Sequence, residues 1–261
     1  MLYILLITSF SVWFLMRTIS SSFIYFVIFF IVLLSPIVKG EGDVNKNVKS
    51  VTLGIVVFPP LVIKDNETGK CSGEVVEMSD VLLKQLGYDM KIECIPPARL
   101  YERVRKGEID LTVNVKGTAA LDDNAMFIEK PVTFLTLIRL ANTTRLDEKS
   151  IAGIRGYDYI GERKRLEEQG YVFFNMPSSI DSIRLFLFDR TANLITYERP
   201  FYHFLGDRKT DSDTALITLK RNIPTFFAVS LNSPHKKDLY NKLTEFSRSF
   251  NESTILEYTK N

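Results

Sequence analysis

The sequence has 261 residues, of which 25% are charged and 12% are aromatic, and its formal net charge is +2. This length suits one large domain or two smaller lobes, and the composition is typical of a globular protein rather than a disordered one. A net charge so close to zero excludes general electrostatic binding of nucleic acid, because such binding requires a concentrated basic face. We therefore expect a globular chain without a nucleic-acid partner.

The first forty residues differ from the rest of the chain. They hold two cations, Arg17 and Lys39, and no acidic residue, so the remaining 31 cations balance the 31 anions. Residues 23–34 are continuously apolar. Twelve residues match the core of a signal peptide and fall short of the roughly 20 that a membrane-spanning helix needs. Residues 1–40 are thus predicted to be a signal peptide or an N-terminal membrane leader, with Met16 as an alternative start.

This leader predicts export to the periplasm, and the alternative is a protein tethered to the membrane by an uncleaved N-terminal segment. Export changes how the two cysteines, Cys71 and Cys94, are interpreted. Their spacing fits neither a metal site nor a redox motif, and an oxidising compartment permits a disulfide between them. Two unpaired cysteines are the alternative, because a sequence does not supply the distance between their Cα atoms.

The first half of the body alternates between strand and helix patterns. A β-branched run predicts a strand over 51–57, and apolar residues at helical spacing predict a helix from Gly73 to Gly87. Further patterns predict a strand at 91–95, a helix at 99–106 and a strand at 109–115. This order is typical of a parallel α/β sheet, in which ligand sites lie beyond the carboxyl ends of the strands.

The second half repeats the alternation after an extended apolar segment at 134–140. Strands are predicted at 151–156, 171–174 and 194–197, and helices near 162–169 and 180–187. An extended segment at 226–231 then precedes a C-terminal helix that contains Leu239, Leu243, Phe246 and Phe250. The fold class predicted from the whole pattern is α/β.

The order of short motifs resembles one known family over residues 51–258. These motifs are VFPP at 57–60, SGEVVE at 72–77, LGY at 86–88, PAR at 97–99, GEID at 107–110, FIEKP at 127–131 and IAGIRGY at 151–157. Together they resemble the type II periplasmic solute-binding proteins of family 3, which feed polar amino acids to ABC importers.

The resemblance implies a two-lobed α/β fold with a hinge of two extended crossings, near 134–140 and 219–228, and a solute held between the lobes. Lobe 1 would comprise residues 41–135 plus 222–261, and lobe 2 residues 136–221. Closure of the lobes on a ligand would be a hinge motion.

Two departures from the family pattern weaken the case for a free α-amino acid as the ligand. The family's arginine, which grips the carboxylate with paired hydrogen bonds, is absent from the segment 119–123. In the second lobe, the segment 189–193 ends in Asn193 where the family usually has an aspartate.

The candidate ligand-binding residues follow predicted strand ends. Phe58 could stack on a ligand or belong to the core, and Arg99 could bind an anion or form a salt bridge within the first lobe. Tyr157 and Tyr159 follow Gly156 at a predicted helix N-terminus, where backbone N–H groups can meet an anion. The predicted set is Phe58, Arg99, Asn114, Lys116, Thr118, Tyr157, Tyr197 and Glu198.

Among these, Lys116 is equally explained as a solvated loop lysine. Glu198 could hold a cationic ligand group or pair with Arg199 or Arg155. No catalytic residue, metal ligand or cofactor is predicted, because the sequence contains no nucleophile elbow, phosphate loop or dinucleotide glycine pattern.

The sequence therefore predicts a monomeric extracytoplasmic binding protein that closes on a small polar solute, amino-acid-like or another small organic molecule, and delivers it to the permease of an ABC importer in the inner membrane. One alternative is a ligand-sensing protein that contacts a membrane receptor. The other is an enzyme similar to the cyclohexadienyl-acid dehydratases of the same fold, which would need a positioned acid and base such as Glu198 with Arg99.

Overall fold

The structure is a computed structural model that describes residues 49–206 and 215–260. The predicted leader, residues 1–40 with the alternative start at Met16, lies outside the described residues. Within the described ranges, no helix combines the length and the apolar character needed to cross a membrane.

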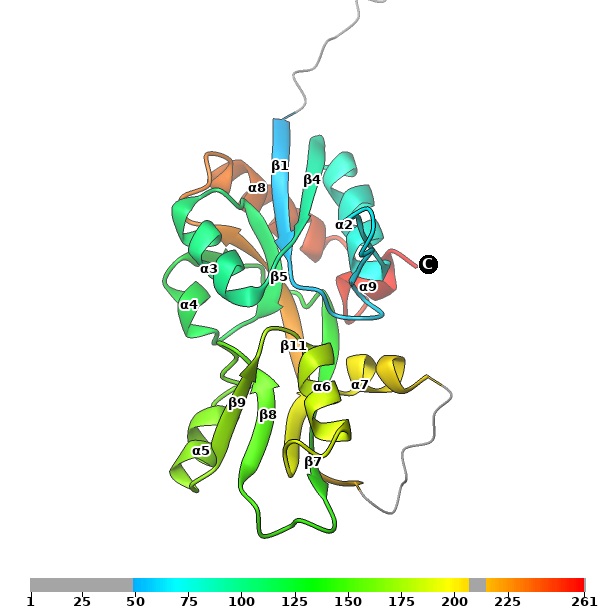
Figure 1. The fold of residues 1–261 in the computed structure, drawn as a ribbon. Helices are drawn as coiled ribbons and strands as arrows, with labels where there is room; N and C mark the ends of the chain where they lie inside the picture. The colour runs from blue at the N-terminus through cyan, green and yellow to red at the C-terminus, as the bar shows by residue number, and fades with distance from the viewer. Residues whose placement is uncertain (1–48, 207–214, 261) are drawn as a thin grey trace, which may run out of the picture. The chain divides into compact units, whose positions relative to one another are not determined.

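The described chain forms a mixed α/β fold (Figure 1). Its strands are β1 (Lys49–Ile55), β2 (Ile63–Lys64), β3 (Cys71–Ser72), β4 (Tyr88–Cys94), β5 (Leu111–Val115), β6 (Ala125–Phe127), β7 (Thr133–Asn142), β8 (Ser150–Ile154), β9 (Val172–Met176), β10 (Asn193–Tyr197) and β11 (Ala215–Ser230). Its helices are α2 (Glu74–Gln85), α3 (Pro97–Lys106), α4 (Ala119–Asp122), α5 (Glu162–Glu168), α6 (Ser179–Leu187), α7 (Glu198–Leu205), α8 (Lys236–Arg248) and α9 (Ile255–Tyr258).

One sheet connects both halves of the described chain. Its strand order is β4-β1-β5-β11-β7-β10-β8-β9, with β6 paired to β11. At one side β1 runs parallel to β4 and β5, and at the other β8 runs parallel to β9 and β10. The carboxyl ends of each parallel set therefore lie at one edge of that set, as the alternation in the sequence predicts.

The two halves of the sheet are linked by the long strands β7 and β11, which run through the middle of Figure 1. They are antiparallel to each other from Ala215 opposite Asn142 to Thr225 opposite Thr133. Beyond that pairing β11 continues along β5, while β7 also pairs with β10. The predicted extended segments at 134–140 and 226–231 belong to these strands, and β11 begins earlier than the apolar pattern indicates.

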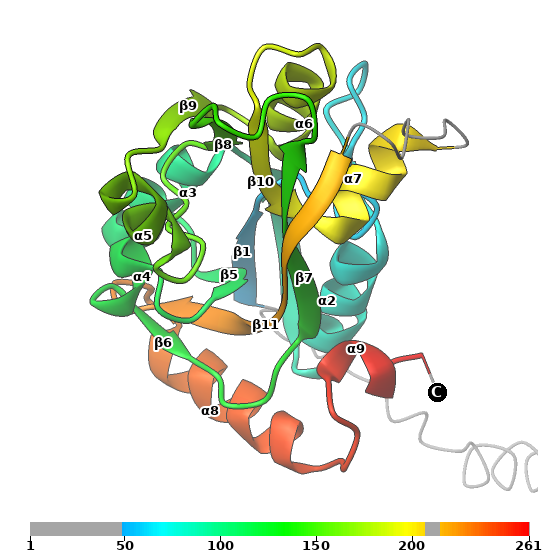
Figure 2. The ribbon, with the colours of Figure 1, turned by 90° about the horizontal axis from the view of Figure 1, so that it is seen from below.

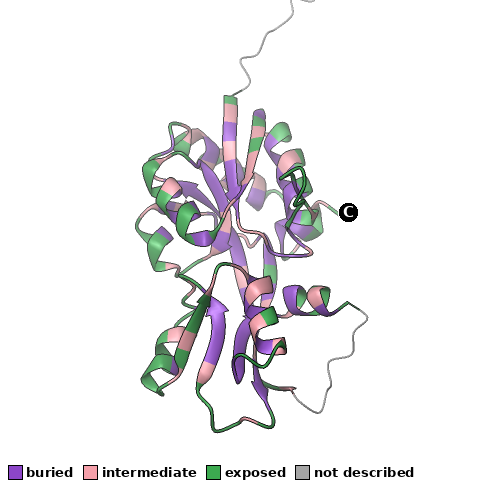
Figure 3. Cartoon of the chain, viewed as in Figure 1, coloured by how far each residue is buried: buried purple, intermediate pink, exposed green. Residues whose placement is uncertain are grey.

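Buried strands lie beneath helices with exposed outer faces (Figure 3). One buried apolar cluster contains residues of both halves, among them Leu53 and Ile195. In the first half Leu53 of β1 and Leu82 of α2 are fully buried in one cluster. In the second half β7 and β10 pack against α6 and α7 through Ile138, Leu194 and Ile183, all fully buried. Figure 2 shows α8 and α9 beside the first half, so the chain returns there after the second half is complete.

Cys71 and Cys94 form a disulfide with a Cα–Cα distance of 6.0 Å. Cys71 begins β3 and Cys94 ends β4, so the bond attaches the β2–β3 hairpin to the main sheet. Both cysteines are buried.

A buried tyrosine fixes α8 to the sheet. The Tyr88 hydroxyl donates to Asp238 of α8 at 2.7 Å, and Lys49 and Lys242 lie 3.0 and 3.5 Å from the same carboxylate. The hydrogen bond from Tyr88, followed by that from Lys49, lowers the pKa of Asp238 to about 2.

We expect Asp238→Asn to lower the free energy of unfolding at pH 7 by less than about 1 kcal/mol, because the carboxylate is 40% exposed and screened by solvent. A group whose pKa is depressed by folding contributes stability above its unfolded pKa and loses it as the pH falls through the folded value. In urea titrations the difference in the free energy of unfolding between variant and wild type should thus shrink as the pH falls from about 4 to about 2. Asp80→Asn, which removes an exposed pair with Lys84 on α2, is the control; a difference that persists unchanged at pH 2 would contradict this account.

Candidate functional site

A cavity that is partly open to solvent is lined by residues from both halves of the sheet. Its walls come from the carboxyl ends of β1, β5 and β10 and the segments that follow β1, β5 and β8, together with residues of α2, α3 and the two linking strands. These are the carboxyl ends of the parallel strands, where ligands bind in open α/β sheets. The cavity is the candidate binding site.

The wall from the first half is built on two strand ends. Phe58 follows β1 in a tight turn, in which its N–H donates to the Val62 carbonyl at 2.8 Å and its carbonyl accepts from the Val62 N–H at 3.0 Å. Asn114, near the end of β5, accepts from the Val115 N–H at 2.9 Å, and the Thr118 hydroxyl donates to the Val115 carbonyl at 2.8 Å. These bonds hold Phe58 and Asn114 in place on the cavity wall.

The wall from the second half is aromatic. Tyr157, Tyr159 and Ile160 lie in the turn between β8 and α5, and Tyr197 is the last residue of β10. The Tyr159 hydroxyl accepts from the Ile154 N–H, which ties the turn to β8. The rings of Tyr157 and Tyr159 lie 5.7 Å apart, and the Tyr197 ring lies 6.4 and 6.2 Å from them.

One aromatic pair joins the two walls. The centroids of Phe58 and Tyr197 lie 5.1 Å apart in an edge-to-face arrangement, the geometry that the ring quadrupoles favour. At the surface, Arg199 of α7 lies 3.9 Å from Glu74 of α2, so an exposed ion pair also connects the halves. The two walls are therefore in contact in this conformation.

The cavity wall is close to electrically neutral. Among the described residues that line it, Asp158 is the one charged side chain; it is exposed and accepts from the Gly161 N–H at 2.6 Å. Burial raises the pKa of Tyr157 and Tyr197 well above the usual tyrosine value, and it raises that of Tyr101 to about 12. These phenols are protonated at neutral pH.

The structure brings five of the eight predicted residues to this cavity: Phe58, Asn114, Thr118, Tyr157 and Tyr197. The other three, Arg99, Lys116 and Glu198, lie outside its lining. The lining also includes residues that the sequence reasoning did not select, notably Tyr101 of α3, Leu61 and the strand residues Thr133 and Thr225.

Helix geometry explains why α3 contributes Tyr101 rather than Arg99. The buried residues of α3 are Pro97, Leu100, Tyr101 and Val104, which is the i, i+3, i+4, i+7 spacing of one helix face. Arg99 falls on the opposite face and is exposed. The same spacing, read from the sequence, would have pointed to Tyr101.

Lys116 and Glu198 have partners outside the cavity. The Lys116 ammonium lies 5.3 Å from the centre of the Phe226 ring. Glu198, at the start of α7, accepts from Lys220 at 2.6 Å, so its partner is neither Arg199 nor Arg155. The Glu198–Arg99 pair that a dehydratase would use is therefore not part of the cavity lining.

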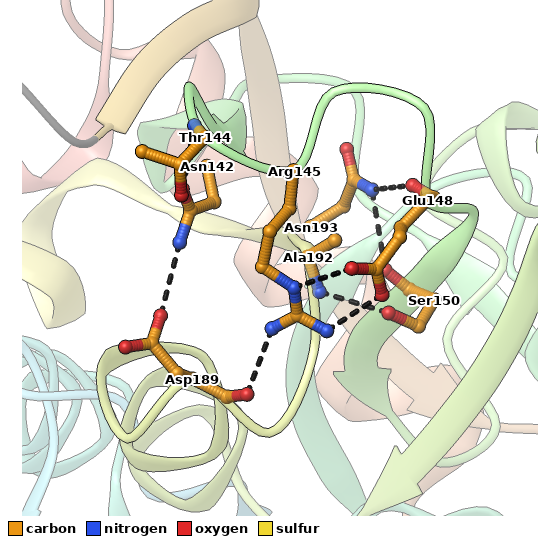
Figure 4. Close-up of polar contacts among 8 residues, drawn as sticks. All are labelled: Asn142, Thr144, Arg145, Glu148, Ser150, Asp189, Ala192 and Asn193. Atoms are coloured by element: carbon orange, nitrogen blue, oxygen red, sulfur yellow. Dashed lines mark hydrogen bonds and ion pairs between the residues drawn. The ribbon is translucent and has the colours of Figure 1, made fainter.

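Asn193 belongs to a polar network at the amino ends of β8 and β10 (Figure 4). Its amide donates to the carbonyls of Glu148 and Ser150 at 2.9 and 3.2 Å. Arg145 joins the same network through the Glu148 carboxylate and the Asp189 carbonyl. Asn193 begins β10 and Tyr197 ends it, so this network lies roughly 13 Å from the cavity at about 3.3 Å per strand residue.

The described ranges contain no group of three or more histidine, cysteine, aspartate or glutamate side chains placed to hold a metal ion. The cavity lining offers tyrosine, threonine and asparagine side chains with one exposed carboxylate. Its chemistry is that of hydrogen bonding and aromatic contact with an organic molecule.

No protein-family model matches the sequence, and no curated protein gives a significant match. Several solved structures share the fold. An ancestral arginine-binding protein bound to arginine is similar with a TM-score of 0.63 and 15% identity, over 81% of this chain and 92% of that one.

Two further structures are similar to the same extent. A histidine kinase sensor domain with similarity to periplasmic binding proteins has a TM-score of 0.64 and 16% identity, over 82% of this chain and 93% of that one. An ancestral amino-acid-binding protein, a precursor of cyclohexadienyl dehydratase, has a TM-score of 0.61 and 13% identity, over 82% and 91%. The expected fold is confirmed: the chain has the two-lobed α/β fold of the type II periplasmic binding proteins.

Proposed function

We propose that the chain is a monomeric extracytoplasmic solute-binding protein that closes on a small polar organic solute and delivers it to an ABC importer in the inner membrane. The observation that carries this proposal is a cavity walled by residues from both halves of the sheet. Lobe 1 would comprise residues 41–135 plus 222–261, and lobe 2 residues 136–221, with β7 and β11 as the crossings. Residues 1–40 would direct the protein to the periplasm or tether it to the membrane.

The contacts between the walls suit a closing motion. Phe58 and Glu74 belong to the proposed lobe 1, and their respective partners Tyr197 and Arg199 belong to lobe 2. These contacts would separate when the lobes open, and the surface ion pair contributes little because both side chains are nearly half exposed. Opening would therefore break the aromatic contact between Phe58 and Tyr197 at the cavity.

The test is a thermal-shift screen of residues 41–261 against amino acids, amines, organic acids and small peptides, with small-angle scattering of every hit. A ligand at a hundred times its dissociation constant stabilises the native state by about 2.7 kcal/mol. For a body of this size the melting temperature should rise by roughly 5–10 °C, and the radius of gyration should stay equal or fall. A protein that responds to no solute in the screen would contradict the proposal.

A ligand sensor that contacts a membrane receptor is the second candidate, because one of the similar structures is a sensor domain. The two candidates share the cavity and differ in the partner of the closed form. Permease and ATPase genes beside this gene would favour the importer, and a receptor gene would favour the sensor.

A further inference from the structure

The cavity differs from a site for a free amino acid in the charges it offers. A bound α-amino acid brings a carboxylate and an ammonium group, and each needs a partner of opposite charge when it leaves water. No arginine or lysine is found among the described lining residues, and Asp158 is exposed and already accepts from Gly161. Burial of an ionised carboxylate without a counter-charge costs several kcal/mol. The wall therefore disfavours anions and zwitterions.

The polar groups deeper in the cavity are hydrogen-bond donors. Asn114 accepts the Val115 N–H at its Oδ1 atom at 2.9 Å, and its amide NH₂ gives the cavity wall two donors. Tyr101 adds a phenol to the same wall, and a phenol can donate its proton. A ligand oxygen can take that proton.

Tyr157 and Tyr197 add two more phenols to the same wall. Both residues line the cavity, and their rings lie 6.4 Å apart. A phenol in a largely apolar site gains when a ligand supplies an acceptor, because a polar group left unpaired away from water carries a desolvation penalty. An ammonium group supplies no acceptor to the phenols, and it would find aromatic ring faces but no buried carboxylate among the described lining residues.

We infer that the cavity takes an uncharged organic ligand that combines an aromatic or other apolar body with a neutral hydrogen-bond acceptor such as a carbonyl oxygen. The body would pack on Phe58 and the tyrosine rings, and the acceptor would face the phenol donors of Tyr101 and Tyr197. This inference rests on the proposed function and narrows the ligand class of the same site.

The decisive experiment is a matched ligand panel on the same purified protein. The panel combines three bodies (phenyl, indolyl and cyclohexyl) with four head groups (a carboxamide, a carboxylate, a primary amine and an α-amino acid group). Calorimetry gives the dissociation constant of each compound. At least one carboxamide should bind ten-fold or more tightly than its three charged counterparts. A charged member that binds as tightly as its carboxamide would overturn the inference.

The panel also separates this inference from the proposed function. If no panel member binds while the broader solute screen yields a ligand, the inference is overturned and the binding-protein proposal stands. If neither set yields a ligand, both fail.

Two variants test the phenol donors directly. Tyr101→Phe and Tyr197→Phe keep the rings and remove the hydroxyls, and each should weaken carboxamide binding about five-fold or more, in line with loss of one hydrogen bond. Tyr202→Phe, which changes an exposed tyrosine of α7 outside the lining, is the matched control and should bind like wild type. Unchanged affinity in both cavity variants would overturn the assignment of these hydroxyls as donors.

Discussion

Removal of the Cys71–Cys94 disulfide is expected to lower the free energy of unfolding by about 3 kcal/mol, the chain-entropy contribution of a loop of this length. For a chain of this size the melting temperature should fall by roughly 6–12 °C. The effect reaches the cavity, because the bond anchors the hairpin that follows Phe58, Leu61 and Val62, three residues of the first wall. We therefore also expect weaker ligand binding in the absence of the bond.

The measurement is a urea titration of wild type, of reduced wild type and of the double variant Cys71→Ala with Cys94→Ala. Reduced wild type keeps both side chains, so its difference from the oxidised protein isolates the covalent bond from the packing of the two buried cysteines. Equal stability of oxidised and reduced wild type would show that the bond does not constrain the unfolded chain.

Gly107→Ala is expected to cost about 3 kcal/mol of stability, which combines backbone strain with overpacking. Gly107 ends α3 at φ 74°, in the left-handed region that disfavours a side chain. A Cβ atom there would lie 2.4 Å from the carbonyl oxygen of Asn232, in the turn after β11. Either the end of α3 or that turn must move, and α3 carries Tyr101 to the cavity.

Gly87→Ala is the matched control for this prediction. Gly87 follows α2 at a similar φ of 82°, but a Cβ atom there meets no other atom within 4 Å. It should therefore cost about 1 kcal/mol, the backbone part alone. Equal losses in the two variants, measured by chemical denaturation, would show that the contact with Asn232 is relieved without cost.

The sequence predicts the regular elements well where apolar periodicity is strong. The patterns at 51–57, 99–106 and 194–197 correspond to β1, α3 and β10 with shifts of a few residues at their ends. The short elements β2, β3, β6, α4 and α9 have two to four residues each and carry too few positions for a periodic signal. The start of β11, at 215–218, lies before the extended crossing predicted near 219–228, and its apolar residues Leu216 and Ile217 are exposed.

The candidate site was predictable to the extent that strand ends mark it. Asn114 near the end of β5 and Tyr197 at the end of β10 line the cavity, as the topology requires. Arg99 and Glu198 were chosen for their charge, but a charged side chain at the start of a helix is free to turn to solvent or to a neighbour such as Lys220. The place of Tyr101 in the cavity lining is set by the face of α3 on which it lies rather than by a strand end. The place of Thr225 is set by the pairing of β11 with strands distant in the sequence.

The pairing of β7 with β11 has a consequence for how the chain reaches its native state. β5 and β7 each pair with β11 along much of their length, and β11 begins at Ala215, some seventy residues after the end of β7. A nascent chain that lacks β11 leaves both strands with an open edge in the middle of the sheet. Contacts so distant in sequence slow folding. The sheet can close only after β11 has been synthesised, and a chain truncated before β11 would expose edges prone to aggregation.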